Sequence, residues 1–415
     1  MKILWVKAGK LLPVDAGGKI RSYNILRYLQ QHHELVLVTP YGGKRDLVYE
    51  SEIKKEFPGA LPIWTSAPDS STLARIFHYL YCFPSGVPFS IRKFTDRAAG
   101  KKIEQLIGHE KFGAVICDFL APSLTFPRKL WGQTILFQHN VETVLWDRML
   151  ANEPSRLKRL LYRLEAGRMR RYECSSIGKF QHVIAVSEQD RAYMSQFMPA
   201  DKISVVPTGV DLDQYRLTSG GQAREPLVMF TGTMNFEPNV DGVEYFCREI
   251  WPRVLKAVPK ARFRIVGKEP VAAVRRLESE TVEVTGTVPS VIEHLQQAWA
   301  LVVPLRMGGG TRLKIYEGMA MGRAIVSTSI GAEGLDVHHG KDIILADEAE
   351  TFADAVITVL REPDLRKRYE RAAAEMVARF SWASVSERFV EVLAGAVPSR
   401  NSVTADSLHV GAARG

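Results

Sequence analysis

The chain has 415 residues, which is too long for one ordinary hydrophobic core and predicts two domains of roughly 200 residues each. Hydrophobic residues make up 46% and charged residues 24%, as in soluble globular proteins. No apolar run approaches the about 18 residues that a membrane-spanning helix needs. The first residues hold a short apolar run broken by Lys7, which predicts an initial strand and not a signal peptide.

The net charge of +9 leaves nucleic acid, an anionic membrane surface and an anionic substrate as candidate partners. The basic residues are not interleaved with aromatic residues along one element, which ranks nucleic acid last. The four cysteines are scattered, without a CxxC pair. Their spacing supports neither a metal site nor a disulfide and indicates a reducing cytoplasm.

The first half of the chain alternates apolar strand-like runs with helical patterns. Strands are predicted at 3–6 and 34–39, and a helix at 19–31 joins them in a right-handed βαβ unit. Gly17 and Gly18 lie at the strand-to-helix turn. Glycines there let the backbone approach a ligand closely or serve only a tight turn, and the residues alone leave both interpretations open.

Polar residues follow another predicted strand, after a less regular stretch at 42–96 that predicts helices joined by loops. The strand at 134–137 runs directly into His139, Asn140 and Glu142. Open α/β sheets place their chemistry at the carboxyl ends of strands. His139 is therefore a candidate hydrogen-bond donor to a sugar or phosphate, and Glu142 a candidate acid or base, with Asn140 beside it on the acceptor side. The alternative for His139 is that it only caps the next helix.

Residues 154–173 predict a long amphipathic helix that is rich in Arg and Lys. Leucines recur along it at helical spacing. The favoured interpretation is a solvated helix whose leucines pack on the sheet. The alternative is peripheral docking of this helix on a membrane surface. The leucines are Leu157, Leu160, Leu161 and Leu164.

The chain divides into two α/β halves at a predicted linker, 217–226. The expected domains are 1–216 and 227–380, both doubly wound, and they place a ligand in the cleft between them. A helix at 381–396 is expected to pack back on the first domain. The small, polar tail at 397–415 is expected to be disordered.

The first strand of the second half ends in a loop of small residues, Thr231-Gly232-Thr233. Small residues at the carboxyl end of a strand allow close approach of a ligand to the backbone. Gly232 and Thr233 are therefore candidate donor-binding residues. The strands predicted in this half are 227–230, 262–266, 282–284, 300–303, 324–327 and 342–345.

The stretch at 301–335 carries the strongest chemical pattern of the chain. A buried strand, three consecutive glycines, a helix expected at 312–321 and a second buried strand follow one another. Backbone amides without side chains in front of them, together with the helix dipole, form a seat for an anion such as a diphosphate. The pattern lacks the GxxxxGK[ST] of a P-loop and the GxGxxG of a dinucleotide fingerprint. The candidate anion-binding residues are Gly308, Gly309, Gly310, Thr311 (also the expected helix cap), Arg312, Lys314 and, further along, Glu317.

Two segments, FTGTMNFEPNVDGV at 230–243 and VPLRMGGGTRLKIYEGMAMGRAIVSTSIGAEGL at 303–335, resemble the GT-B glycosyltransferases. The resemblance is specifically to the retaining nucleotide-sugar enzymes of glycosyltransferase family 4 (group 1), and it extends over nearly the whole chain. Within the family, the QHNVE and RMRRYE segments are similar to sugar transferases of bacterial exopolysaccharide clusters, including those associated with exosortase systems. The resemblance implies two Rossmann-like domains facing across a cleft.

The resemblance also implies roles for residues that match the family's motifs. Glu317 matches the second Glu of the E-x7-E motif, which implies a bond to the ribose hydroxyls of the nucleotide. The first Glu falls at Gly309, so the amides of the glycine loop are expected to share the contact with the donor sugar. No Arg and Lys pair follows Phe230 to neutralise the diphosphate, and Arg312 and Lys314 are the expected substitutes.

On the first domain, His139 matches the family's His near the transferred sugar, and Gly17 and Gly18 match its glycine loop at the phosphates. The implied reaction is metal-independent transfer with retention, in which Arg312, the loop amides and the helix dipole stabilise the leaving diphosphate. The expected catalytic residues are thus His139, Arg312 and Glu317. The expected donor is a UDP- or GDP-linked sugar, and no cofactor is expected. The acceptor is expected to be a glycan, a lipid-linked molecule or a small molecule in bacterial surface polysaccharide or glycoconjugate synthesis.

Two other functions stay open on the same residues. A nucleotide-sugar epimerase of the same architecture would turn over its donor without an acceptor. A non-catalytic nucleotide-sugar-binding protein is the alternative from a different class, because Gly309 replaces a motif Glu. The expected location is the cytoplasm, at the inner face of the membrane if the basic helix docks there.

Overall fold

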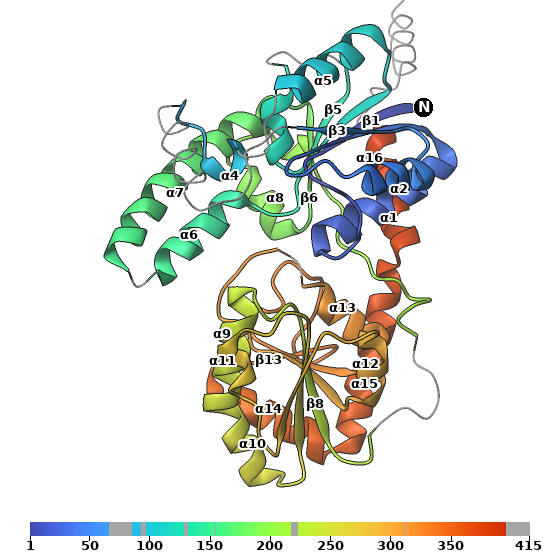
Figure 1. Cartoon of the computed structure of the whole chain (residues 1–415). Coiled ribbons are helices and arrows are strands. Elements are labelled where there is room, and N and C mark those ends of the chain that lie inside the picture. The colour runs from blue at the N-terminus through green and yellow to red at the C-terminus, as the bar shows by residue number, and fades with distance from the viewer. Residues whose placement is uncertain are drawn as a thin grey trace, which may run out of the picture.

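The computed structural model describes residues 1–65, 85–92, 97–127, 132–153, 155–216, 223–310 and 312–395, without the side chain of Asn152. Figure 1 shows two α/β domains, one above the other, each built on its own sheet. The predictions for Thr311, for most of the linker and for the tail at 397–415 fall outside the described residues.

The first domain is built on a seven-stranded parallel sheet in the order β3-β2-β1-β4-β5-β6-β7. The inner strands are continuous apolar runs because helices cover both faces of the sheet. Its strands are β1 (Lys2–Lys7), β2 (Glu34–Tyr41), β3 (Ala60–Trp64), β4 (Ala114–Asp118), β5 (Thr134–Phe137), β6 (His182–Ala185) and β7 (Ile203–Val205). Its helices are α1 (Gly17–His32), α2 (Leu47–Glu56), α4 (Phe89–Arg92), α5 (Arg97–His109), α6 (Glu142–Asn152), α7 (Arg156–Ile177) and α8 (Glu188–Met194).

The second domain has a six-stranded parallel sheet in the order β10-β9-β8-β11-β12-β13. In both sheets the chain starts in the middle and reverses its direction of growth, between β1 and β4 and between β8 and β11; ligands bind beside such reversals in open α/β sheets. The strands are β8 (Leu227–Thr231), β9 (Arg262–Val266), β10 (Val282–Gly286), β11 (Ala300–Val303), β12 (Ala324–Ser327) and β13 (Ile344–Leu345). The helices are α9 (Glu237–Tyr245), α10 (Trp251–Ala257), α11 (Ala272–Arg275), α12 (Val291–Gln297), α13 (Leu313–Ala320), α14 (Ala349–Arg361) and α15 (Pro363–Val377).

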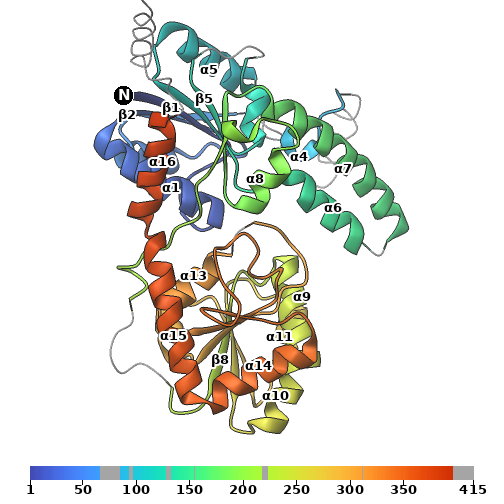
Figure 2. The same ribbon diagram turned by 180° about the vertical axis from the view of Figure 1, so that it is seen from behind.

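The last helix, α16 (Trp382–Gly395), leaves the second domain and packs on the first, as Figure 2 shows from behind. The ring of Phe389 is fully buried, with its centroid 5.6 Å from that of Trp5 and 5.2 Å from that of Phe137. Gln133 Nε2 donates to the carbonyl oxygen of Leu393 at 2.8 Å. The chain therefore crosses between the domains twice, once before β8 and once after α15.

Several sequence predictions hold within a residue or two, and others are wrong. Residues 60–64 form β3, inside the stretch predicted as helices and loops. Pro62 made a strand look improbable in the sequence. The strand tolerates proline because it lies at the edge of the sheet. The helix after β8 begins at Glu237 and runs without a break through a π-helical segment at Phe246–Ile250 into α10.

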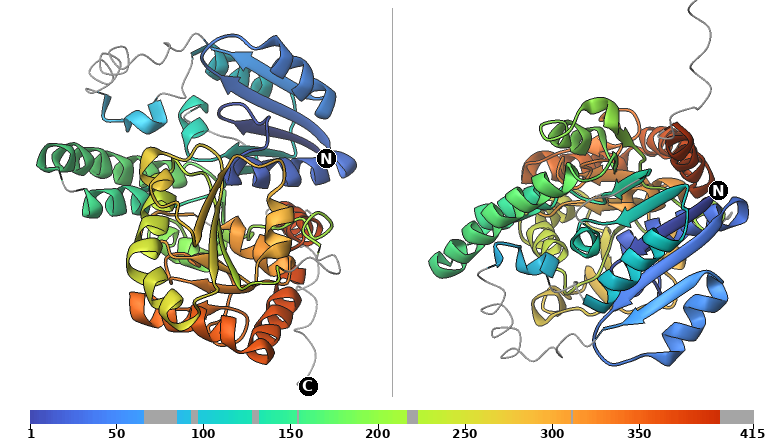
Figure 3. Two further views of the ribbon diagram at one scale, coloured as in Figure 1. Left: turned by 60° about the horizontal axis from the view of Figure 1, so that its bottom comes forward. Right: turned by 90° about the horizontal axis from the view of Figure 1, so that it is seen from above.

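The prediction that the leucines of the basic helix pack on the sheet is wrong as well. Leu157 is 79% and Leu160 59% exposed, because α7 begins well outside the domain and reaches the sheet only in its second half. There Met169 and Ile177 are fully buried. Figure 3 shows α6 and α7 projecting side by side from the body of the molecule. Among the described residues, no helix has the length and apolar character needed to cross a membrane.

Candidate active site

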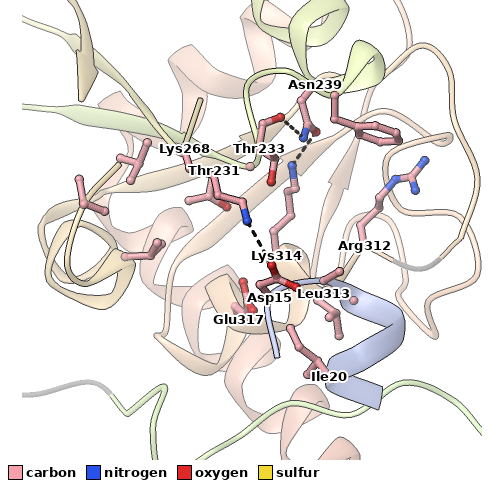
Figure 4. Close-up of a pocket in the computed structure, with 18 of the residues that line it drawn as sticks. Asp15, Ile20, Thr231, Thr233, Asn239, Lys268, Arg312, Leu313, Lys314 and Glu317 are labelled. Carbon is pink, nitrogen blue, oxygen red and sulfur yellow. Dashed lines mark hydrogen bonds and ion pairs between the residues drawn. The ribbon is translucent and has the colours of Figure 1, made fainter. Parts of the chain in front are cut away.

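A cavity of about 480 Å³ lies between the two domains. Its walls come from the start of α1 in the first domain and, in the second, from the ends of β8, β9 and β11 and the start of α13. Figure 4 shows the polar side chains that point into it. Of the candidate residues from the sequence, those that line the cavity are Gly17, Gly232, Thr233, Arg312, Lys314 and Glu317.

Lys314 is the central basic group of the second-domain wall (Figure 4). Its Nζ atom donates to Asn239 Oδ1 at 3.1 Å and lies 4.0 Å from the centroid of the Phe230 ring. Burial lowers the pKa of Lys314 to about 7, with the charge of Arg312 acting in the same direction and that of Glu317 against it. Because its hydrogen bond to Asn239 goes to a neutral amide, an anion in the cavity would stabilise its protonated form.

Gly232, directly after β8, leaves room for the side chain of Lys314 because it has no β-carbon. A β-carbon at this position would lie 2.7 Å from Asn239 Nδ2, closer than real β-carbons come, and 3.0 Å from Lys314 Nζ, which is a tight contact. Asn239 in turn donates to the carbonyl oxygen of Thr233 at 2.9 Å. The small-residue loop after β8 and the helix α13 are therefore fitted to each other around one lysine.

Glu317 lies one turn further along α13 and faces Tyr215, from the chain that leaves the first domain. Burial raises the pKa of Glu317, against a hydrogen bond from Tyr215 and the charge of Lys314. Burial and Glu317 together raise the pKa of Tyr215 well above its usual range. A carboxylate accepts only, so Glu317 is suited to bind neighbouring hydroxyl groups such as those of a ribose.

Lys268 is a site residue that the sequence reasoning missed. It follows β9, lines the cavity, and its Nζ atom lies 3.7 Å from Asp15 Oδ2 of the first domain. Asp15 also accepts from Lys19 Nζ at 3.0 Å. The available signal was Gly267 before Lys268, the same combination of a strand end and a small residue that singled out Gly232.

Two helices begin at the cavity. Gly17 opens α1, and Leu313 opens α13 behind Arg312 as its N-cap residue; neither helix has a side-chain cap on its first N–H groups. Free amides and the positive ends of two helix dipoles therefore meet Lys268 and Lys314 in one space. Gly17 is thus the first residue of a helix and not part of a preceding turn. An arrangement of this kind binds an anionic group such as a diphosphate.

The glycine loop, Gly308 to Gly310, lies against the first domain and not in the large cavity. A β-carbon at Gly309 would lie 2.0 Å from Leu145 Cδ2, and one at Gly310 would lie 2.3 Å from Asn140 Oδ1. Gly310 also has a φ of 76°, which favours glycine. Glycine at 309 has a physical reason here, since any larger residue would require the Leu145 side chain of α6 to shift.

Arg312 supports this loop from behind. Its Nη1 atom donates to the carbonyl oxygens of Gly309 and Gly310, the second at 2.9 Å. Its Nε and Nη2 atoms are buried and have no hydrogen-bond partner among the described residues. Burial lowers the pKa of Arg312 to about 10. The guanidinium thus fixes the loop and keeps two donors for a group that enters the site.

Arg148, on α6, forms an ion pair with Glu333 of the second domain, and we call this pair the clasp. Its Nη1 and Nη2 atoms donate to the two carboxylate oxygens of Glu333, each at 2.5 Å, and Nη1 also donates to the carbonyl oxygen of Gly308 at 2.6 Å. The small space beside this pair, about 30 Å³, is lined by Asn140, Asp190 and the glycine loop. A bidentate pair of this type fixes orientation as well as distance, so it holds the domains together at the loop.

His139 lies in a buried network of the first domain, outside both cavities. Its Nε2 atom is 2.7 Å from Asp118 Oδ1, and Lys7 and the Trp5 indole donate to Asp118 Oδ2 at 3.2 and 2.9 Å. Phe119, at a φ of 75°, stacks on the imidazole with 3.7 Å between the ring centroids. Burial lowers the pKa of His139 to about 3, against the charge of Asp118. Phe119 also fills the space above Gly18, whose β-carbon would lie 2.4 Å from that ring.

The alternative that His139 caps the next helix is wrong. Glu173, from α7, takes that place: its carboxylate accepts from the N–H groups of Glu142 and Thr143, both at 2.9 Å, and from the Thr143 hydroxyl at 2.6 Å. Burial raises the pKa of Glu173. Glu142, the candidate acid or base, therefore lies at the first turn of α6 and lines neither cavity. The described residues contain no cluster of three His, Cys, Asp or Glu side chains that could hold a metal.

Two parallel-sheet α/β domains that face a common cavity match the GT-B fold of solved glycosyltransferase structures. Residues 16–214 match the family described as Glycosyltransferase Family 4, and residues 225–362 match Glycosyl transferases group 1. The chain therefore belongs to the family 4, group 1 glycosyltransferases, which confirms the resemblance read from its motifs.

The similar proteins differ widely in sequence. An uncharacterised protein of the cps region of Klebsiella pneumoniae is 24% identical over 54% of this chain and 58% of its own length. The phosphatidyl-myo-inositol mannosyltransferase of Mycolicibacterium smegmatis is 26% identical over 57% of this chain and 62% of its own length. Thus the matches span about three fifths of these relatives. The structure of Anabaena HepE in complex with UDP and glucose has a TM-score of 0.64 at 13% identity, over 95% of this chain and 99% of that one, and shows likeness of fold alone.

Proposed function

We propose that the protein is a retaining glycosyltransferase that moves a sugar from a UDP- or GDP-linked donor to a glycan, lipid-linked or small-molecule acceptor. One observation carries the proposal: Lys268, Lys314, the amino termini of α1 and α13, and Glu317 meet in a single cavity between the domains. This set matches the needs of a nucleoside diphosphate, whose charge binds to bases and amides and whose ribose binds to a carboxylate.

The role in bacterial surface polysaccharide or glycoconjugate synthesis is part of the same proposal. Supporting it are the relative from a cps region and the relatives that transfer mannose to phosphatidyl-myo-inositol. HepE, of the same fold, binds UDP and glucose by the description of its structure. A lipid-linked acceptor would place the protein in the cytoplasm at the inner face of the membrane, in contact through the basic helix α7.

The residues support the following division of work. The amides at the starts of α1 and α13, with Lys268 and Lys314, bind the diphosphate and stabilise the charge that grows on it as the sugar leaves. Glu317 holds the ribose. The acceptor hydroxyl attacks from the face on which the diphosphate departs, and a diphosphate oxygen takes its proton, which gives retention. The family resemblance implies that His139 contacts the sugar. The ring of Phe119 covers the imidazole and has to move aside before this contact can form.

The donor is identified by thermal-shift measurements with UDP, GDP, ADP and their common sugars on the wild type, Glu317→Gln and the control Glu350→Gln. Glu350 is an exposed carboxylate of the same domain. A ligand at about 100 times its dissociation constant stabilises the folded state by about 2.7 kcal/mol. One nucleotide should stabilise the wild type and the control but not Glu317→Gln. Equal shifts in all three proteins, or none with any nucleotide, would contradict the proposed site.

The reaction class is tested with the donor so identified. The product should form only with an acceptor, should keep the anomeric configuration of the donor in proton NMR spectra, and should form at an unchanged rate in EDTA. Fast turnover of donor without acceptor would indicate the epimerase instead. An inverted product would contradict retention, and loss of activity in EDTA that Mg²⁺ or Mn²⁺ restores would contradict metal independence.

A further inference from the structure

The outer end of α7 carries an exposed apolar stripe. We call its four residues the leucine stripe; they are Leu157 (79% exposed), Leu160 (59%), Leu161 (40%) and Leu164 (46%). Large hydrophobic side chains that are more than a third exposed occur singly or in pairs elsewhere in the described chain. Four within eight residues on one helix form a contiguous patch, and such patches mark interaction surfaces.

The leucine stripe lies on the side of α7 that faces away from α6. At about 100° per residue, its four members fall within an arc of about 100° on the helix, and Tyr162 falls about 150° from the centre of that arc. Tyr162 packs edge-on against Trp146 of α6, with 5.8 Å between the ring centroids. The side of α7 that meets α6 is therefore opposite the leucine stripe.

The pair of helices is held firmly without help from the leucine stripe. Glu173 binds the first amides of α6, as described above, and Arg170 Nη2 donates to Asp147 Oδ2 at 2.8 Å. Met169 and Ile177 anchor the inner half of α7 in the core. These contacts hold α7 in place, and none of them involves the four leucines of the stripe.

Basic side chains flank the leucine stripe. The exposed part of α7, residues 156–164, has four Arg or Lys and no Asp or Glu. Arg156 and Arg163 fall about 90–110° to one side of the stripe and Lys158 about 110° to the other. All three are exposed, and none forms an ion pair with another described residue. The two acidic residues of α7 are both buried: Glu165 directly follows the leucine stripe, and Glu173 lies near the inner end of the helix.

We propose that the outer end of α7 docks on an anionic membrane, with the leucine stripe inserted at the interface and Arg156, Lys158 and Arg163 on the lipid phosphates. An apolar stripe between rows of basic residues is the pattern of a helix that lies in the membrane surface. The choice of partner rests on the proposed function, since a lipid-linked acceptor is held in a membrane. A second copy of the chain fits less well, because two such basic helix ends repel each other.

Docking at this place would also set the position of the active site. Helix α6 touches α7 through Trp146, and its Leu145 and Arg148 contact the glycine loop and Glu333 of the second domain. Only one helix therefore separates the proposed membrane contact from the contact between the domains. A membrane bound at α7 lies beside the cleft, where an acceptor anchored in lipid could enter without leaving the bilayer.

The test is flotation of the full chain with vesicles of phosphatidylglycerol and phosphatidylethanolamine, compared with vesicles of phosphatidylcholine. We expect binding to the anionic vesicles to be at least about tenfold stronger. Leu157→Ser/Leu160→Ser and Arg156→Gln/Lys158→Gln should each weaken it by about tenfold or more. The matched controls Leu47→Ser/Val48→Ser and Lys101→Gln/Lys102→Gln change exposed residues of α2 and α5 and should bind as the wild type does.

Equal flotation of the leucine-stripe variant and the wild type, or no flotation of either, would overturn the proposal. Sedimentation velocity adds a second readout: a wild-type dimer that the leucine-stripe variant converts to a monomer would assign the stripe to a second copy instead. Circular dichroism melts of the variants should match the wild type, because the changed side chains are exposed. Nucleotide-dependent thermal shifts, measured on the same samples, separate a failure of the membrane contact from a failure of the nucleotide site.

Discussion

The two walls of the cleft are built in opposite ways. On the second domain, Lys314, Lys268 and Glu317 point into the cavity, with charge that the described chain balances only in part. On the first domain, the polar group singled out from the sequence, His139, is bound to Asp118 and covered by Phe119. The comparison teaches that the charged groups of the second domain already face the cavity, whereas His139 of the first domain can contact a ligand only after Phe119 moves.

The largest effect on ligand binding is expected at the second-domain wall of the cavity. Lys314→Met should weaken binding of the nucleoside diphosphate by roughly tenfold to a hundredfold, about the 1.5–3 kcal/mol that a hydrogen bond to a charged group contributes. The control Lys256→Met changes an exposed lysine of α10 and should leave the affinity unchanged. Isothermal titration calorimetry measures both. Equal affinities for wild type and Lys314→Met would remove Lys314 from the site.

The same lysine predicts a pH dependence. Its pKa is lowered to about 7, so it is mostly charged below that pH and mostly neutral above it. The anionic ligand binds the charged form better. Affinity in the wild type should therefore fall as pH rises above about 7, by at most tenfold per pH unit. Lys314→Met should lack this fall, whereas a fall of the same size in the variant would trace it to another group.

The next effect is expected at the contact between the walls. Gly309→Glu restores the family's motif residue but brings its β-carbon within 2.0 Å of Leu145 Cδ2, so it should open the cleft and weaken donor binding. Leu145→Ala in the same chain makes room and should restore part of the affinity. Small-angle scattering should show a larger radius of gyration for the single variant than for the double one. A single variant that binds as tightly as the wild type would contradict this contact.

A smaller effect is expected for the clasp between Arg148 and Glu333. The pair is bidentate but partly exposed, with 29% and 28% of the two side chains accessible, so we expect a coupling free energy of about 1 kcal/mol. A double-mutant cycle of Arg148→Ala and Glu333→Gln in urea unfolding measures it. Additive effects of the two changes would mean that the clasp contributes nothing to holding the domains together.

No titration near neutral pH is expected at the covered histidine. The pKa of His139 is lowered to about 3, below the ordinary value of about 6.5 that it has in the unfolded chain. The unfolded chain therefore takes up the proton first as pH falls, so stability due to this group is full above about 6.5 and is lost toward about 3. NMR of the imidazole should show no titration of His139 between pH 6 and 8. A midpoint within that range would mean that the imidazole is not covered in solution.

Much of the fold could be predicted because its strands are continuous apolar runs. Residues 300–303 and 324–327 are strands with the predicted bounds, since β11 and β12 are buried along their whole length. β3 could not be predicted, because an edge strand with a proline lacks that pattern. The leucine stripe was misjudged because helical spacing shows that a face is apolar, and does not show what lies against it.

The candidate site was predictable where one segment builds it. Lys314 and Glu317 share a helix with the glycine loop before it, and local spacing brought them together. Lys268, Asn239, Tyr215 and Asp15 were missed because their meeting depends on which strand ends are neighbours and on how the domains face each other. The local sequence also could not explain why residue 309 is a glycine, because the side chain that restricts it, Leu145, belongs to the opposite domain.

The most direct test of the account is a crystal structure of the protein with the nucleoside diphosphate that stabilises it most. We predict electron density for the diphosphate between the starts of α1 and α13, within hydrogen-bond distance of Lys314, and for the ribose hydroxyls at Glu317. A nucleotide bound elsewhere, or one in this cavity that touches neither Lys314 nor Glu317, would contradict the account.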